Sequence, residues 1–78
     1  MRPIYKIAEE IKSDWTNWRK SYAADYLMAM TQLNRIDDDY YCDSADSIIR
    51  YFLSNAASWR GETARRIKKE LKDMVGLK

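Results

Sequence analysis

Histidine is absent from this chain of 78 residues, and cysteine and proline occur once each. Without histidine the chain lacks the side chain that most often serves as a general acid–base and as a neutral metal ligand. A single cysteine excludes an internal disulfide and a cysteine-based zinc site. We therefore expect a protein that is not an enzyme and that holds neither a metal ion nor another cofactor.

Chain breakers and long apolar runs are also scarce. Glycine occurs twice, whereas an all-β fold needs a turn every ~8–12 residues. No apolar run approaches the ~18 residues of a membrane span, and no apolar segment follows Met1 as in a signal peptide. Hydrophobic residues at 46% and charged residues at 33% are typical of a globular domain. We expect a single helical domain over residues 1–78, located in the cytoplasm and without a membrane partner.

Hydrophobic residues at helical spacing predict an all-α, compact bundle of three to four helices, depending on whether the first two merge. Asp43 or Ser44 is expected to cap the third helix, and Gly61 to end or bend it. Gly76 is a suitable residue to follow the last helix. We expect the helices at about 3–20, 21–35, 44–59 and 62–75.

An acidic, aromatic segment separates the second and third helices, and we predict that residues 34–43 form the longest loop. Residues 21–43 carry five Asp and one Arg, and consecutive aspartates favour turns. A calcium loop is not predicted, because its sixth and twelfth positions need Gly and Glu, and the chain has Cys42 and Ile48 there when counted from Asp37.

Tyrosines supply contact area in protein interfaces, and aspartates pair with a basic partner. The segment therefore favours a partner-binding surface, although a solvated loop whose tyrosines pack back onto the bundle is the alternative. The residues predicted to contact the partner are Asp37, Asp38, Asp39, Tyr40, Tyr41 and Asp43.

The C-terminal segment has the opposite charge. Residues 59–78 carry seven Lys and Arg against three Asp and Glu, although the whole chain is only +2. Helix–turn–helix proteins place a basic helix of this kind in the major groove, and phosphate contacts supply its affinity. The alternative is a solvated face, in which Glu62 pairs with Arg66 one turn later. The candidate nucleic-acid contacts are Arg60, Arg65, Arg66, Lys68, Lys69 and Lys72.

Aromatic residues are numerous for this length, with three Trp, six Tyr and one Phe. A core of this size cannot bury all of them, so we expect some to form an exposed patch. Exposed aromatic side chains mark interfaces more often than cofactor sites.

Two stretches, Ser-Ile-Ile-Arg-Tyr-Phe-Leu-Ser-Asn-Ala-Ala-Ser-Trp-Arg-Gly-Glu-Thr-Ala-Arg-Arg-Ile-Lys-Lys-Glu-Leu at 47–71 and Pro-Ile-Tyr-Lys-Ile-Ala-Glu-Glu-Ile at 3–11, resemble a family of short, uncharacterised proteins encoded by bacteriophages. The resemblance covers under half of the chain and carries no catalytic motif. It implies a phage protein acting in the cytoplasm of a bacterial host cell.

By analogy with anti-CRISPR proteins, the resemblance implies an inhibitor that binds a host protein, such as a CRISPR nuclease or another nucleic-acid-processing enzyme. The alternatives are a small nucleic-acid-binding regulator and a homo-oligomeric structural component.

Overall fold

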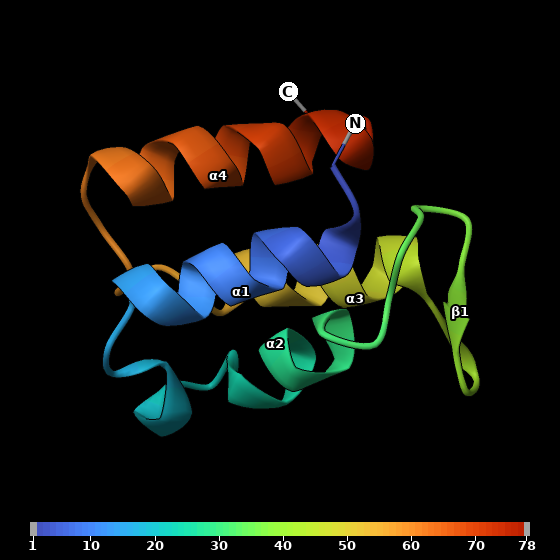
Figure 1. Ribbon diagram of the computed structural model, residues 1–78, viewed down its shortest axis with the longest axis horizontal. Helices are drawn as coiled ribbons and strands as arrows, with labels where there is room; N and C mark the ends of the chain where they lie inside the picture. The colour runs from blue at the N-terminus through green and yellow to red at the C-terminus, as the bar shows by residue number, and fades with distance from the viewer. Residues whose placement is uncertain (1, 78) are drawn as a thin grey trace.

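The computed structural model describes residues 2–77, and this part of the chain is mostly helical. The helices α1 and α3 each pack against both α2 and α4, which lie on opposite sides of the molecule (Figure 1). In chain order the elements are α1 (Ile4–Asp14), the 3₁₀ helix η1 (Trp18–Lys20), α2 (Ala24–Met30), β1 (Asp39–Tyr40), β2 (Asp43–Ser44), α3 (Ala45–Ser54) and α4 (Glu62–Met74).

The all-α prediction describes the helices but misses a short hairpin in the segment predicted to be the longest loop. Asp39 lies opposite Ser44, and Tyr40 lies opposite Asp43, in an antiparallel pair of strands. Ser44 also caps α3, because its hydroxyl accepts a hydrogen bond of 3.1 Å from the N–H of Ser47. The predicted cap is therefore confirmed at Ser44, and the fold is largely but not purely helical.

The first helix is shorter than the predicted range 3–20, because α1 ends at Asp14. The residues around this end are Ser-Asp-Trp-Thr-Asn at 13–17, and short polar side chains compete with the helix for backbone hydrogen bonds. The chain turns there and resumes as η1, so that Trp18 returns to the core on a separate element. The first two helices therefore do not merge.

The second and third helices are also shorter than predicted, for the same local reason. Before α2, the hydroxyl of Ser21 accepts a hydrogen bond of 3.2 Å from the N–H of Ala23. After α3, the side-chain amide of Asn55 donates to the carbonyl of Tyr51 at 2.8 Å. Both bonds are local alternatives to helix continuation. They lie where α2 starts later than the expected range 21–35 and where α3 ends earlier than the expected range 44–59.

The last helix matches its prediction to within one residue. Gly61 neither ends nor bends α3, which stops at Ser54; it is the N-cap of α4 and has a positive φ of 115°. At the other end Gly76 has φ 75°, and the N–H of Leu77 donates to the carbonyl of Lys72 at 2.8 Å. This is the 6→1 bond of a Schellman motif, which confirms Gly76 as the residue that closes the helix.

An aromatic cluster lies in the core near the C-terminal ends of α1 and α3. The indoles of Trp15 and Trp59 stack with ring centroids 5.8 Å apart, and Phe52 meets each of them edge-on at 6.4 Å. The indole N–H of Trp59 donates to the carboxylate of Asp14 at 2.8 Å, which satisfies the polar atom of a buried ring. The largest fully buried side chains of the core are Ile4, Ile7, Ile11, Leu27, Met30, Leu33, Ile49, Phe52, Ile67 and Leu71.

Candidate protein-binding site

The first two aspartates of the acidic segment stabilise the turn that leads into the hairpin. The carboxylate of Asp38 accepts hydrogen bonds from the N–H groups of Asn34 and Arg35, at 2.9 and 2.8 Å. These two backbone bonds lower the pKa of Asp38. Asp37 is exposed and forms an ion pair of 3.3 Å with Arg35. Of the predicted contact residues, Asp38 therefore has a structural role, whereas Asp37 forms an exposed ion pair that contributes little.

The two tyrosines of the segment have different environments. Tyr40 is half-buried and packs against the core, whereas Tyr41 is 88% exposed. Their rings meet edge-to-face with centroids 4.7 Å apart, so the exposed ring of Tyr41 packs against the half-buried ring of Tyr40. The alternative in which both tyrosines pack onto the bundle is therefore correct for Tyr40 and wrong for Tyr41.

Tyr41 also has an unusual backbone. It is the first of the two residues that connect β1 and β2, and its φ of +55° is the only positive value at a non-glycine residue among residues 2–77. A two-residue hairpin turn with positive φ at its first position normally has glycine there. For a residue with a Cβ this conformation costs about 1 kcal/mol, so the fold keeps the exposed ring at a cost in stability.

Helix α2 contributes a part of this surface that the sequence reasoning missed. A hollow of about 350 Å³ is lined by Met28 of α2 and by Gln32, which lies in the turn after α2, together with Asp39, Tyr40 and Tyr41. Met28 is 49% exposed. The sequence carried part of the signal, because Met28 lies off the line of apolar side chains that Ala23, Leu27 and Met30 form at helical spacing.

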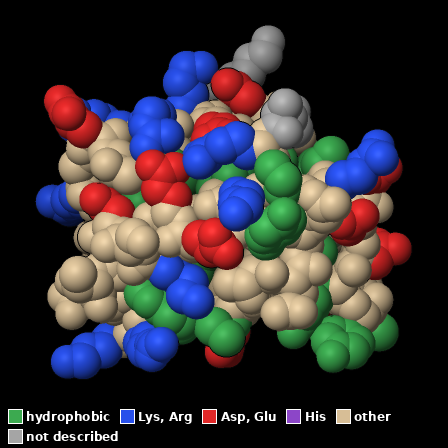
Figure 2. Space-filling view, viewed as in Figure 1, with side chains coloured by type: hydrophobic (Ala, Val, Ile, Leu, Met, Phe, Trp, Pro, Cys, Tyr) green, Lys and Arg blue, Asp and Glu red, His purple; other side chains and the backbone are tan. Residues whose placement is uncertain are grey.

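We call Met28, Gln32, Asp39, Tyr40, Tyr41 and Asp43 the hairpin surface. Figure 2 shows hydrophobic side chains at the lower right edge of the molecule, with carboxylates above them, where Figure 1 places the hairpin. No lysine or arginine lines the hollow. Exposed Asp39 and Asp43 therefore give this surface, whose hydrophobic members are Met28, Tyr40 and Tyr41, a negative border.

Of the six basic residues predicted as nucleic-acid contacts, two have hydrogen-bond partners on other parts of the chain. Arg66 donates to the carboxylate of Glu10 on α1, instead of pairing with Glu62 on its own helix as expected. Lys68 is half-buried, and its Nζ donates to the carbonyls of Ala56 and Trp59 at 2.7 and 2.6 Å. These bonds hold the turn after α3 against α4, and burial lowers the pKa of Lys68.

Arg66 belongs to a charge network that joins α1 to α4. The guanidinium of Arg2 bridges Glu10 and Glu70, with nitrogen–oxygen distances of 2.8 and 2.7 Å. Hydrogen bonds from Arg66 and then from Arg2 lower the pKa of Glu10. The network therefore stabilises the packing of the two helices rather than presenting free cations.

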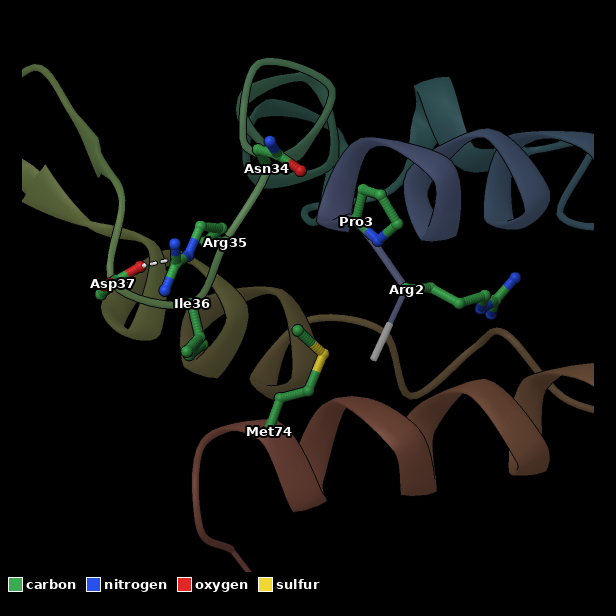
Figure 3. A pocket seen from close by; sticks show the side chains of 7 residues that line it. All are labelled: Arg2, Pro3, Asn34, Arg35, Ile36, Asp37 and Met74. Carbon is green, nitrogen blue, oxygen red and sulfur yellow. Dashed lines mark ion pairs between the residues drawn. The ribbon is translucent and has the colours of Figure 1, made fainter.

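A second hollow, of about 360 Å³, lies between the start of α1, the segment after α2 and the end of α4 (Figure 3). Its position follows from hydrogen bonds of the N–H groups of Ile4 and Tyr5 to carbonyls of residues 34 and 33, at 2.9 and 2.8 Å. Figure 3 shows Arg35 turned toward Asp37, and Arg2 directed away from Met74. The charged groups around this hollow are thus used by their own partners and do not converge on it.

Within residues 2–77 no three carboxylate or thiol groups come together in a way that could hold a metal ion. In the same part of the chain, no helix is long and apolar enough to cross a membrane. Cys42 is exposed at the hairpin turn.

Comparisons with protein-family models, with curated proteins and with solved structures found no match to this chain. The arguments about function below therefore rest on the geometry and charge of its own surfaces.

Proposed function

We propose that this protein acts by binding a basic surface of another protein through its hairpin surface, without catalysing a reaction. The observation that carries the proposal is Tyr41, whose ring is 88% exposed while its backbone has a positive φ. Backbone strain retained at an exposed position supports a functional role there. Tyrosine is also among the residues enriched at the energetic centres of protein interfaces.

The carboxylates at the border of the hairpin surface indicate a partner with positive charge. Asp39 and Asp43 are exposed on either side of the Tyr40–Tyr41 pair, and the hollow beside them contains no cation. A partner that presents Lys or Arg around an apolar pocket would be complementary in both charge and shape. Host enzymes that process nucleic acids hold phosphates on such surfaces, which is why a CRISPR nuclease or a related host enzyme is the partner class we propose for a phage inhibitor.

The test compares two tyrosines that are almost equally exposed. Tyr22 is 91% exposed and lies before α2, outside the residues that line the hollow. Immobilised wild-type protein, Tyr41→Ser and Tyr22→Ser are incubated with lysate of a bacterial host, and captured proteins are quantified by mass spectrometry. We expect a protein that Tyr22→Ser retains and Tyr41→Ser loses.

The captured protein is then purified and titrated by calorimetry. Removal of a central tyrosine is expected to weaken binding by about 30-fold, which corresponds to about 2 kcal/mol. Equal binding by both variants would show that the hairpin surface is not the interface. A mass that falls on light scattering only for Tyr41→Ser would instead identify a second copy of the chain as the occupant.

A further inference from the structure

The outer face of α4 is a second charged surface, on the side of the molecule opposite α2 (Figure 1). It carries an open hollow of about 590 Å³ lined by four basic residues, one carboxylate and one apolar side chain. These residues are Arg65, Lys68, Lys69, Lys72, Asp73 and Leu77. We propose that this face binds the phosphodiester backbone of nucleic acid.

The cations of this face are mostly available for a ligand. Arg65 and Lys72 are exposed and have no ion-pair partner among residues 2–77. Lys69 pairs with Asp73 at 3.2 Å, and both side chains are largely exposed, so this pair contributes little and can be exchanged for a phosphate. Arg65, Lys69 and Lys72 follow one another about one turn apart on the helix.

The cations also crowd one another. Burial is the main cause that lowers the pKa of Lys68, and repulsion from Lys72 and then from Arg60 lowers it further. Lys72 lies one turn after Lys68 on α4, and Arg60 lies just before the helix. A bound anion would relieve this repulsion. The six basic residues predicted from the sequence therefore fall into two groups. Arg66 donates to Glu10, and Lys68 donates to two backbone carbonyls. The other four are exposed: Arg60, Arg65, Lys69 and Lys72.

A polyanion fits this face better than an acidic protein does. The centre of a protein interface needs aromatic or aliphatic anchors, whereas apart from the aliphatic stems of the basic residues the only large apolar side chain lining the hollow is Leu77, which is 36% exposed. Nucleic acid needs no such anchor, because its charge density of one phosphate per ~1.7 Å of duplex supplies the affinity. This face and the hairpin surface lie on different elements and share no residue.

The test measures fluorescence anisotropy of labelled duplexes of about 20 base pairs, one DNA and one RNA, with the full chain at ~50 and ~200 mM salt. Three phosphate contacts predict that affinity for DNA falls roughly 40-fold between these two salt concentrations. For Arg65→Ala/Lys72→Ala we expect binding about tenfold weaker at ~50 mM salt, and a fall of only about threefold with salt. Salt-dependent binding of either duplex supports the proposal, and the tighter duplex identifies the nucleic acid.

Lys6→Ala/Lys20→Ala is the matched control, because it removes the same net charge from exposed positions outside α4. We expect it to keep the affinity to within about twofold, together with the wild-type salt dependence. Equal losses in both double variants would overturn the proposal, since net charge alone would then explain binding. Absence of binding at ~50 mM salt, or tighter binding of polyglutamate than of either duplex, would also overturn it.

Discussion

The two aromatic groups of this chain have opposite environments although their residue types are similar. Trp15, Phe52 and Trp59 are buried: the two indoles stack, Phe52 meets both of them edge-on, and Trp59 donates a hydrogen bond to Asp14. Tyr40 and Tyr41 also form a ring pair, but Tyr41 lies at the tip of a hairpin in a backbone conformation that disfavours any side chain. The first group stabilises the fold, whereas Tyr41 is kept exposed at a cost in stability, and this difference is the basis of the binding surface that we propose.

The largest effect should follow from truncation inside the buried group. Trp59 is only 2% exposed, so Trp59→Ala is expected to lower the free energy of unfolding by about 3–5 kcal/mol, comparable to the whole stability of a domain this small. Trp59→Phe keeps a ring and loses the bond to Asp14, for an expected loss of about 1–2 kcal/mol. Urea unfolding followed by circular dichroism measures both, and an unchanged midpoint for Trp59→Ala would contradict the role of the cluster.

The second effect concerns the hydrogen bonds from Lys68 to the turn between α3 and α4. Lys68→Met keeps the aliphatic stem but removes the Nζ that reaches two carbonyls. Leaving these part-buried acceptors without a donor should cost about 1–3 kcal/mol. Lys69→Met is the control on the same helix, because the Nζ of Lys69 pairs with a largely exposed carboxylate, that of Asp73, and its urea midpoint should stay within the error of the wild type.

The third prediction has the opposite sign and tests the comparison most directly. Tyr41→Gly removes the side chain from a position that favours glycine, so it should stabilise the fold by up to about 1 kcal/mol, or about 4–8 °C in melting temperature. The same variant should lose partner binding. Thermal melting checks the first expectation, and a lower melting temperature than that of wild type would show that Tyr41 belongs with the stabilising aromatic residues.

The smallest expected effect concerns the carboxylates. Some of them should stabilise the fold through their partners, as the buried aromatic residues do, whereas exposed ones should not. Because Arg66 and Arg2 lower the pKa of Glu10 in the folded state, the unfolded chain takes up the proton more readily. The resulting stability is present above the ordinary glutamate pKa of ~4.3 and is lost as the pH falls through the lower folded-state pKa.

Glu10→Gln should therefore flatten the decrease in stability between pH ~5 and ~3, by less than about 1 kcal/mol because the pair is partly exposed. Urea midpoints across this range provide the measurement, with Glu9→Gln as the control, since Glu9 is exposed and lies 3.9 Å from Lys6. Identical profiles for Glu10→Gln and wild type would show that the network does not stabilise the fold.

Much of the fold could be read from hydrophobic spacing. The apolar faces predicted for the four helices are the ones that are buried, and the caps at Ser44 and Gly76 are present. Helix ends were less predictable, because they depend on local hydrogen bonds such as those made by Ser21 and Asn55. The hairpin could not be predicted from propensity, because Tyr41-Cys42 lacks the glycine or asparagine typical of its turn.

The candidate site was predicted only in part. Composition identified the acidic, aromatic segment, but only the packed chain distinguishes Asp38, which holds a turn, from Asp39 and Asp43, which face outward. Likewise, the excess of Lys and Arg on α4 was evident, whereas the partner of Arg66 lies 56 residues away on α1. Pairings at such distances along the chain are set by helix packing.

The amino-acid sequence by itself determined which segments become helices, where their apolar faces lie and how charge divides along the chain, because these properties depend on residues one turn apart. Tertiary structure alone decided that Tyr40 is half-buried and Tyr41 exposed, which cations are neutralised, and how Met28 of α2 meets the hairpin. The physical reason is that burial and ion pairing depend on neighbours far apart in the chain, which only the packing of the helices brings together.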